Sequence, residues 1–435
     1  MASASQPATP TRPAIRLPQS LHRPALVLLL IAVVVAPLWH LHVMNRWMHG
    51  RTDLLPPWLA TRVVLEGGDP YSDVTTKQIQ LSYYGHILSP SETEKDEQAF
   101  AYPIYTAILL APLAYLNWGV ARALYFCAAT VMITLSVPIW LQLTGLRIRA
   151  NQMALLIVLV LASWPVMVAL RHQQLSILVF ALITAGCVLL RHKRETSAAI
   201  LFALSTIKPQ LTVALIAWLL LWAISGRRWR FLASLLAALC GLFLAGEWML
   251  HGWIREWLAA MIHYTHYTHS TFLVPILFIL IPVIGQWVGD AFLLLLALAV
   301  CLCLWKLRRC RAASAEFGIA VSLCLAIMVT LSPATLVWVY NQVDLLPGFL
   351  ILLYARSANR PAYLARQIAL GFLALNFALV FLAVLGETAS GPSKSWDLLP
   401  YWNVLLPAVV TVALCLRFKV GGDTPDNLQP ALLLP

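Results

Sequence analysis

RTDLLPPWLATRVVLEGGDPY, residues 51–71, gathers carboxylates, aromatic rings, a double proline and a double glycine directly after the first apolar segment. Leu55, Leu59 and Val63 recur at a spacing of four, which places them on one face of a helix. The two prolines fall in its first turn, where a missing N–H costs little, and the GGDP run ends it with strong turn chemistry. We expect this short helix, apolar on one side, to lie along a membrane surface.

Asp53 stands at the start of this expected helix and has two interpretations. Asp is a preferred N-cap residue, and for the residue taken alone the capping role is the simpler explanation. The alternative is chemical, because a carboxylate held at an interface can accept a proton from a bound hydroxyl group. The choice depends on which polar residues the fold brings beside Asp53.

The composition is that of a polytopic membrane protein. Of the 435 residues, 60% are hydrophobic and only 11% are charged, and apolar runs of transmembrane length recur along the chain. The formal net charge of +12 comes from short basic clusters between these runs. This placement follows the positive-inside rule and does not indicate a nucleic-acid partner, and the eight Cys residues suggest no disulfide framework.

The apolar runs predict an all-α bundle of about 12 transmembrane helices, with a long first outer loop that carries interfacial helices. The first outer loop covers residues 45–118 within a transmembrane domain of residues 24–416. Residues 1–23 are expected to form a disordered cytoplasmic tail, and residues 417–435 a second cytoplasmic tail. The expected spans cover residues 24–43, 119–143, 152–170, 174–190, 196–207, 210–224, 229–247, 290–305, 314–331, 343–355, 364–384 and 397–416.

Three segments outside these spans need separate interpretation. Residues 103–116 are apolar but short and contain two prolines, so we expect an interfacial helix, with a short span as the alternative. Residues 272–286 contain prolines and a glycine and are interpreted as re-entrant. The acidic run 91–98 is expected to be a solvated, mobile loop, and residues 248–271 a polar loop.

The charges define an orientation in the cytoplasmic (inner) membrane with both termini in the cytoplasm. In that arrangement every inner loop is basic, and the inner segments hold most of the 30 Lys and Arg residues. If residues 103–116 were counted as a span, all later loops would be inverted and the pattern would be lost. The acidic residues on the inner side are then Glu195, Glu316, Asp423 and Asp426.

This topology collects the unusual polar residues on the outer face. Lys208 carries most weight, because it lies between two short spans without an acidic neighbour in sequence, and ionisable groups at membrane depth are rare without a role. A cation below the outer surface suits a phosphate group, and a carboxylate beside it suits a hydroxyl group. The candidate residues are Asp53, Asp69, Arg171, His172, Gln173, Gln174, Lys208, His263, His266, Tyr340, Asn341 and Gln342.

Several of these candidates have a structural alternative. Arg171 could extend to lipid headgroups, and Asn341 and Gln342 could satisfy backbone groups freed by Pro333. The histidines at 263, 266 and 269 could bind a metal, but they converge poorly on one helix, so we expect an interfacial His/Tyr belt and no metal site.

The order of the motifs resembles the GT-C superfamily of integral-membrane glycosyltransferases. The chain is most similar to glycosyltransferase family 87, the polyprenol-phosphate-mannose-dependent mannosyltransferase-like proteins, over residues 24–416. The resemblance implies that Asp53 is the catalytic base. The sequence has no Asp-x-Asp metal motif, so we expect no obligatory metal and no cofactor. It also pairs Lys208-Pro209 with a family Lys-Pro element. The motifs that carry it are Asp53 with GGDPY, FAYP at 100–103, RHQQLSILVF, STIKPQL and SPATLVWVYNQVDLLPG.

The sequence departs from the family pattern at two positions. Gln173-Gln174 matches a Gly-Gln pair, with Gln in place of Gly, and Tyr340-Asn341-Gln342 matches a Tyr-Asp-Gln element, with Asn in place of Asp. The second departure removes a negative charge from that element.

Two functions are consistent with the residues. The first is an inverting transferase that moves a sugar from a polyprenyl-phosphate donor to a hydroxyl of a glycolipid or glycan. In this function Asp53 takes the proton, and Lys208 and Arg171 hold the phosphate. Mannose as the sugar follows from the resemblance alone. The second is a multi-span lipid or polysaccharide transporter or flippase. Against it, the two halves show no clear internal repeat, and the polar residues gather at one face.

Overall fold

The structure is a computed structural model that describes residues 52–267, 285–331, 338–354, 363–375 and 399–420, apart from positions 90, 93, 94, 147, 313, 365 and 372. Within these ranges all regular secondary structure is helical, as the apolar runs predicted. The expected tail 1–23 and the first span lie outside the described residues, as do residues 272–284 of the expected re-entrant segment 272–286 and residues 421–435 of the expected tail 417–435. Residues 417–420 of that tail are helical.

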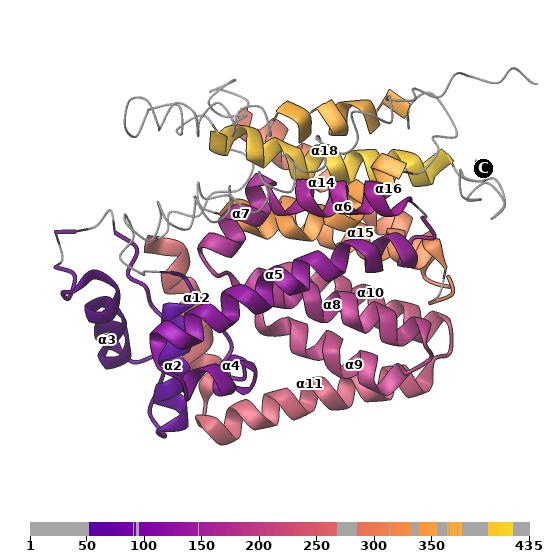
Figure 1. Ribbon diagram of the computed structural model, residues 1–435. Helices are drawn as coiled ribbons and strands as arrows, with labels where there is room; N and C mark the ends of the chain where they lie inside the picture. Colours follow the sequence, from indigo (N-terminus) through magenta and orange to yellow (C-terminus); the bar gives the residue numbers. More distant parts are fainter. Residues whose placement is uncertain are drawn as a thin grey trace, which may run out of the picture.

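Most helices run side by side in one bundle, along the horizontal direction of Figure 1. The breaks between them fall at Gly, Pro and basic residues close to the expected boundaries. The bundle helices are α5 (Trp118–Leu143), α6 (Ala150–Leu161), α7 (Trp164–Arg171), α8 (Leu175–Arg191), α9 (Glu195–Leu204), α10 (Pro209–Ser225), α11 (Trp229–Met249), α14 (Gly285–Leu307), α15 (Ala315–Leu331), α16 (Leu346–Tyr354) and α18 (Leu399–Val420).

Three described helices are long and apolar enough to cross a membrane by themselves, namely α5, α11 and residues 287–307 of α14. The pair α6 and α7 passes the same test as one span that bends by 59° at Ala162-Ser163. Other apolar helices, such as α8, α10 and α15, have 17 residues each and match expected spans in position. The chain is therefore a helical membrane protein, and the expected total of twelve spans stays a prediction.

Four shorter helices gather at one end of the bundle, on the left in Figure 1. They are α2 (Leu55–Leu65), α3 (Asp73–Tyr84), α4 (Thr106–Ala114) and α12 (Trp253–Tyr267). The predicted helix after Asp53 is confirmed as α2, with prolines in its first turn. Trp58 of α2 donates its indole N–H to the carbonyl of Leu113 in α4, 2.9 Å away, which fixes these two helices to each other.

One expectation for this end was wrong, and two features were not anticipated. Residues 253–267 form α12 and not a polar loop. Trp253 packs against Tyr105, the residue before α4, and against Phe243 of α11, and the indole N–H of Trp257 donates to the carbonyl of Ala101. Helix α3 was not anticipated inside the polar stretch, although Ser72 caps its first turn. The acidic run is partly held in place, since Tyr84 Oη donates to the carbonyl of Asp96 at 2.7 Å.

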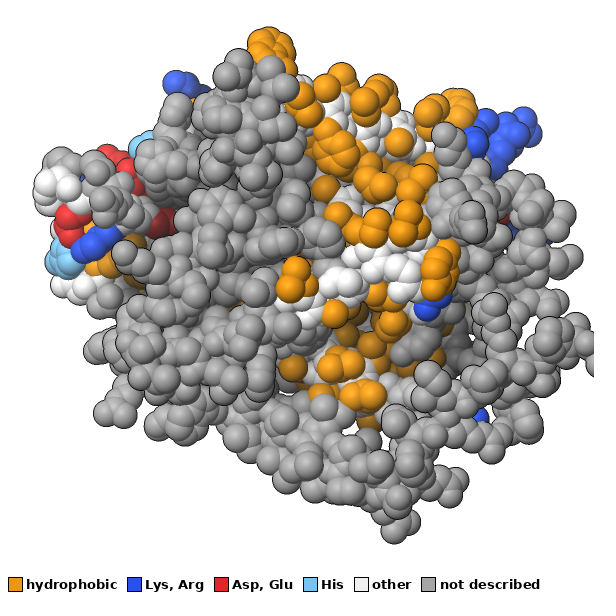
Figure 2. Space-filling view, turned by 90° about the horizontal axis from the view of Figure 1, so that it is seen from above, with side chains coloured by type: hydrophobic (Ala, Val, Ile, Leu, Met, Phe, Trp, Pro, Cys, Tyr) orange, Lys and Arg blue, Asp and Glu red, His pale blue; other side chains and the backbone are white. Residues whose placement is uncertain are grey.

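The opposite end of the bundle is basic, and we call it the basic end. It consists of the connections α8–α9, α10–α11 and α14–α15, with Arg191, Lys193, Arg194, Arg227, Arg228, Arg230, Lys306, Arg308, Arg309 and Arg311. Arg228 donates to the carbonyl of Cys310 at 2.8 Å and lies over the ring of Trp222, which joins two of the connections. Figure 2 shows hydrophobic side chains in a broad band, with Lys and Arg at the right edge and with Asp, Glu and His, together with some Lys and Arg, at the left. The bundle is thus polarised by charge.

Candidate active site

Asp53 lies just before α2 and is held against the turn between α7 and α8. Its backbone N–H donates to the carbonyl of His172 at 3.0 Å. The N-cap of α2 is Leu54 and not Asp53, and no side chain caps the helix. The capping interpretation of Asp53 is therefore wrong, because its carboxylate points to other partners. Oδ1 lies 3.3 Å from Nδ1 of His172, and Oδ2 accepts a short hydrogen bond from the side-chain amide of Gln174.

Lys208 occupies the break between a short 3₁₀ helix, η1 (Ser205–Ile207), and α10. Pro209 takes the first position of α10, where proline is favoured, so the chain changes direction at the lysine. The side chain is only 4% exposed. Its ammonium group donates to Oε1 of Gln174 at 2.9 Å and to Oγ of Ser176 at 2.8 Å.

A third acceptor and an aromatic ring complete the lysine site. Residues 338–345 form a second 3₁₀ helix, η2 (Trp338–Leu345), which packs against α7 and α8. From it, Asn341 Oδ1 lies 3.4 Å from the ammonium and accepts from Ser176 Oγ at 2.6 Å. The ammonium also lies 5.1 Å from the ring centre of Tyr340. Asn341 thus keeps an oxygen ligand for Lys208 without the negative charge of the Asp in the family pattern.

Gln174 connects the two charged groups directly. Its amide nitrogen donates to Asp53 and its amide oxygen accepts from Lys208, so one planar group separates a carboxylate from an ammonium. The amide is also restrained by its backbone, because Tyr125 Oη donates to the Gln174 carbonyl at 2.8 Å. A single side chain thereby fixes the spacing between the candidate base and the candidate phosphate ligand.

The surroundings favour the ionised form of Asp53. Burial raises the pKa of this carboxyl group, but the charge and hydrogen bond of His172, the hydrogen bond from Gln174 and the charge of Lys208 outweigh it and hold the pKa below its usual value. Asp53 is therefore a carboxylate at neutral pH, which is the state that a proton acceptor requires.

A second carboxylate near Asp53 was missed because it lies in the acidic run. Asp96 is held by the Tyr84 hydroxyl at its carbonyl and by the backbone N–H of Gln98, 2.7 Å from its Oδ1. Burial raises the pKa of Asp96 to about 6, and the negative charge of Asp53 adds to this rise. The adjacent residue is also fixed, since Glu97 Oε2 lies 2.7 Å from Nε2 of His263 in α12.

Asp344 is a further carboxylate that the sequence did not single out. It lies in η2, it is completely buried, and both of its oxygens lack a hydrogen-bond partner within the described part of the chain. Lys208 lies within electrostatic reach of it. The only sequence signal was its position two residues after Gln342, in an otherwise apolar stretch.

The other predicted residues occupy different positions. Asp69 accepts from the backbone N–H of Tyr71 at 2.8 Å, so its described contacts belong to the turn before α3. Arg171 ends α7 and is partly buried, one residue before His172. His266 lies in α12 with its side chain outside the described residues. Among the residues that the structure describes, no three His, Cys, Asp or Glu side chains are grouped as metal ligands.

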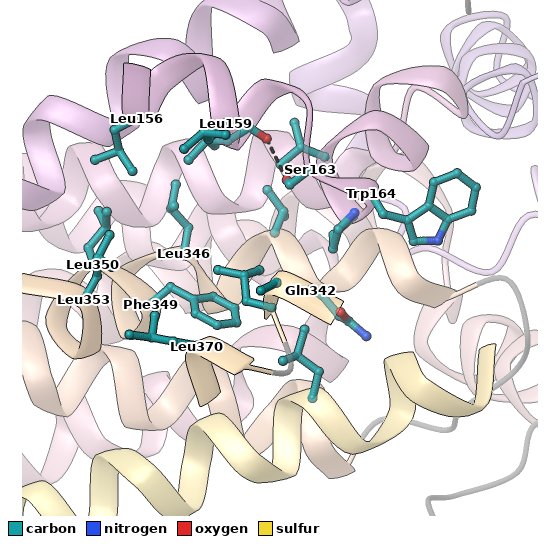
Figure 3. A pocket seen from close by; sticks show the side chains of 17 residues that line it. Leu156, Leu159, Ser163, Trp164, Gln342, Leu346, Phe349, Leu350, Leu353 and Leu370 are labelled. Carbon is teal, nitrogen blue, oxygen red and sulfur yellow. Dashed lines mark hydrogen bonds between the residues drawn. The ribbon is translucent and has the colours of Figure 1, made fainter. Parts of the chain in front are cut away.

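An apolar pocket of about 280 Å³ begins beside η2. Figure 3 shows Gln342, Ser163 and Trp164 at one end and leucines from α6 and α16 at the other. Gln342 follows Tyr340 and Asn341 in η2, so the polar end of the pocket is adjacent in the chain to the lysine site. Its lining is Leu156, Leu159, Val160, Ser163, Trp164, Pro165, Val166, Gln342, Val343, Leu346, Phe349, Leu350, Leu353, Leu370, Leu373, Ala374 and Leu406.

Comparison with known families gives one match. Residues 100–333, more than half of the chain, match the sequence model of glycosyltransferase family 87. The matched region contains Gln174 and Lys208, and it begins after Asp53. No curated protein and no solved structure matches the chain. The family match confirms the resemblance seen in the motifs. The chain belongs to glycosyltransferase family 87 and is a glycosyltransferase with membrane-embedded helices.

Proposed function

We propose that the protein transfers a sugar, mannose by family resemblance, from a polyprenyl-phosphate donor to a hydroxyl group of a glycolipid or glycan. The observation that carries the proposal is the Asp53–Gln174–Lys208 chain of hydrogen bonds. It brings an ionised carboxylate and a buried ammonium to the same end of the bundle at a fixed spacing. A transfer between a hydroxyl group and a sugar phosphate needs both of these groups.

The reaction would proceed with inversion at the anomeric carbon. The acceptor oxygen attacks this carbon, its proton passes to Asp53, and the bond between the carbon and the phosphate oxygen breaks. The polyprenyl phosphate departs with the bonding electrons and gains negative charge as it does so. Lys208 stabilises this charge more strongly in the transition state than in the bound donor, which is the condition for rate acceleration. Arg171, near the same turn, would assist Lys208.

His172 and Gln174 would tune the base. Both bind the carboxylate of Asp53, so they orient it and favour its ionised form before the acceptor arrives. When Asp53 has taken the proton, Gln174 still accepts from Lys208 and keeps the ammonium in place. The amide therefore lets the proton acceptor change its charge without releasing the phosphate ligand.

The apolar pocket supports a lipid-linked donor. A polyprenyl chain is a branched hydrocarbon, and the pocket is lined almost entirely by apolar side chains. They come from α6, α7, η2, α16, residues 370–374 and α18. Its polar end contains Gln342 (Figure 3), which follows Asn341, a contact of Lys208, in η2. Membrane-phase donors of this kind need such a surface beside the catalytic groups, because their tails stay out of water.

The charge polarity of the bundle supports an outward-facing site. The basic end would face the cytoplasm by the positive-inside rule, which puts Asp53 and Lys208 at the outer face of the inner membrane. Nucleotide sugars are absent on that side, so a lipid-phosphate donor fits the location. The transporter alternative gains no support, since the matched family consists of glycosyltransferases.

The test uses purified protein in lipid nanodiscs. Radiolabelled polyprenyl-phosphate mannose is offered together with a membrane glycolipid extract, and labelled product is measured with a nucleotide-linked mannose as the control donor. The proposal expects label to move only from the lipid donor, with loss of transfer in Asp53→Asn and full transfer in Asp73→Asn, an exposed carboxylate of α3. Transfer from the nucleotide sugar alone would contradict the donor assignment.

A further inference from the structure

Gln173 has a backbone conformation that normally favours glycine. Its φ of 53° lies in the left-handed region, where the Cβ of an L-residue crowds the following carbonyl. The turn is a helix C-terminal motif in which the N–H groups of Gln173 and Gln174 donate to the carbonyls of Leu170 and Ala169. Glycine at this position would relieve the strain, so the presence of a glutamine has to be explained by what its side chain does.

Two other turns in the chain have the same backbone conformation and can be compared with the turn at Gln173. Lys193 and Arg227 have φ values of 60° and 53°, with the same pair of backbone hydrogen bonds back to the preceding helix. Both of these residues lie in the basic end with exposed side chains. Gln173, by contrast, is only 4% exposed, although its backbone is alike.

Both ends of the buried Gln173 amide form hydrogen bonds, each to a different segment of the chain. Its oxygen accepts from the hydroxyl of Thr52 at 2.9 Å, and its nitrogen donates to the carbonyl of Arg122 in α5 at 2.6 Å. Thr52 directly precedes Asp53, and Asp53 itself is bound to the residues on either side of Gln173. The side chain therefore ties the segment that carries Asp53 to a bundle helix.

We propose that Gln173 is a positioning residue that fixes the Asp53 segment against α5 and the α7–α8 turn. The strained backbone is retained because glycine could not supply the two hydrogen bonds. This inference rests on the proposed role of Asp53 as the proton acceptor. A displacement of the base by about 1 Å is enough to slow a reaction by roughly a hundredfold, so the tether affects turnover more than donor binding.

The test compares Gln173→Gly with Lys193→Gly, which relieves the same backbone strain without touching the site. Lys193→Gly should keep or slightly raise the midpoint of thermal unfolding. In Gln173→Gly the relief of strain offsets part of the loss of two buried hydrogen bonds, so this variant should fold with a modestly lower midpoint. Lys193→Gly should keep the parent kcat, whereas Gln173→Gly should lose roughly 10- to 100-fold in kcat with the KM for the lipid donor changed by less than about threefold. Thr52→Val, which removes one hydroxyl and keeps the shape, should lower kcat less and add no further loss to Gln173→Gly.

The results for Gln173→Gly and Asp53→Asn test the positioning role and the proposed function separately. If Gln173→Gly keeps the parent kcat while Asp53→Asn is inactive, the positioning role is refuted and the proposed function stands. If Asp53→Asn is active, the proposed function fails whatever Gln173→Gly does. If Gln173→Gly does not fold, Thr52→Val decides alone, and a parent kcat in that variant overturns the inference.

Discussion

Replacing Lys208 by Met removes the ammonium that contacts Gln174, Ser176 and Asn341, and it leaves a side chain of similar length. An ammonium and a phosphate charge about 4 Å apart interact by roughly 4 kcal/mol at an effective dielectric constant of about 20. Since about 1.4 kcal/mol corresponds to a factor of ten, the full loss would be about 10³-fold. Water and Arg171 will compensate in part, so we expect kcat/KM for the lipid donor to fall by roughly 10²- to 10³-fold.

The assay is initial-rate transfer in nanodiscs over a range of donor concentrations. Lys77→Ala removes an exposed lysine of α3 and serves as the control, with unchanged kinetics expected. Lys208→Arg should recover part of the loss, because it restores the charge but not the compact geometry of three hydrogen bonds. A Lys208→Met enzyme that folds and keeps the parent kcat/KM would refute the assignment of the phosphate to this end of α10.

Three further predictions concern the loop, the pocket and the orientation. Asp96→Asn should raise the melting temperature at pH 7 but not at pH 4. The folded-state pKa of Asp96, about 6, lies above the pKa of an Asp in the unfolded chain, so the parent protein loses stability as the pH rises from the unfolded pKa through 6. Equal changes in melting temperature at pH 4 and pH 7 would contradict this. Leu159→Trp should fill the pocket and raise the KM for a long-chain donor several-fold while a donor of two isoprene units is used as before, and equal effects on both donors would count against the tail site. A cysteine at position 73 should react with a membrane-impermeant thiol reagent in intact cells, whereas a cysteine at position 193 should react only after the cells are permeabilised. Labelling at position 193 in intact cells would exclude the proposed orientation.

The local structure around the site was largely predictable from the sequence. The spacing of Leu55, Leu59 and Val63 and the GGDP run locate α2, and the apolar runs locate α5, α8, α10 and α15. These features depend on residues that are close in the chain. The placement of Lys208 at a helix break was predictable for the same reason, because Pro209 follows it.

The direction of the Asp53 side chain was not predictable, because capping and catalysis both place Asp at that position. The choice is made by the α7–α8 turn, about 120 positions later in the chain, through contacts that no local pattern encodes. Asp96 was missed for a related reason. Its acidic neighbours suggest solvent, but α3 and α12 fold over its segment and bury the carboxylate.

The sequence singled out Lys208 as a candidate phosphate ligand, but it did not identify Gln174 as the residue that links the two charged groups. Lys208 stood out in the sequence as an unpaired cation, and its match to a family Lys-Pro element supported a role. Gln174 did not, because an amide between two helices has many structural uses. Only the structure shows that its two ends contact the two charged groups, which makes it the centre of the site.

Asp53→Asn removes the proton acceptor and leaves the rest of the site in place. Asn keeps the size of the side chain and one hydrogen-bond acceptor, and the structure assigns Asp53 no capping role whose loss could disturb α2. Transfer from the polyprenyl-phosphate donor and equilibrium binding of that donor are measured on the same nanodisc preparation. The account predicts parent-like donor binding with transfer reduced by about 10²- to 10⁴-fold, the range that a positioned general base supplies. An Asp53→Asn protein that transfers the sugar at the parent rate would contradict it.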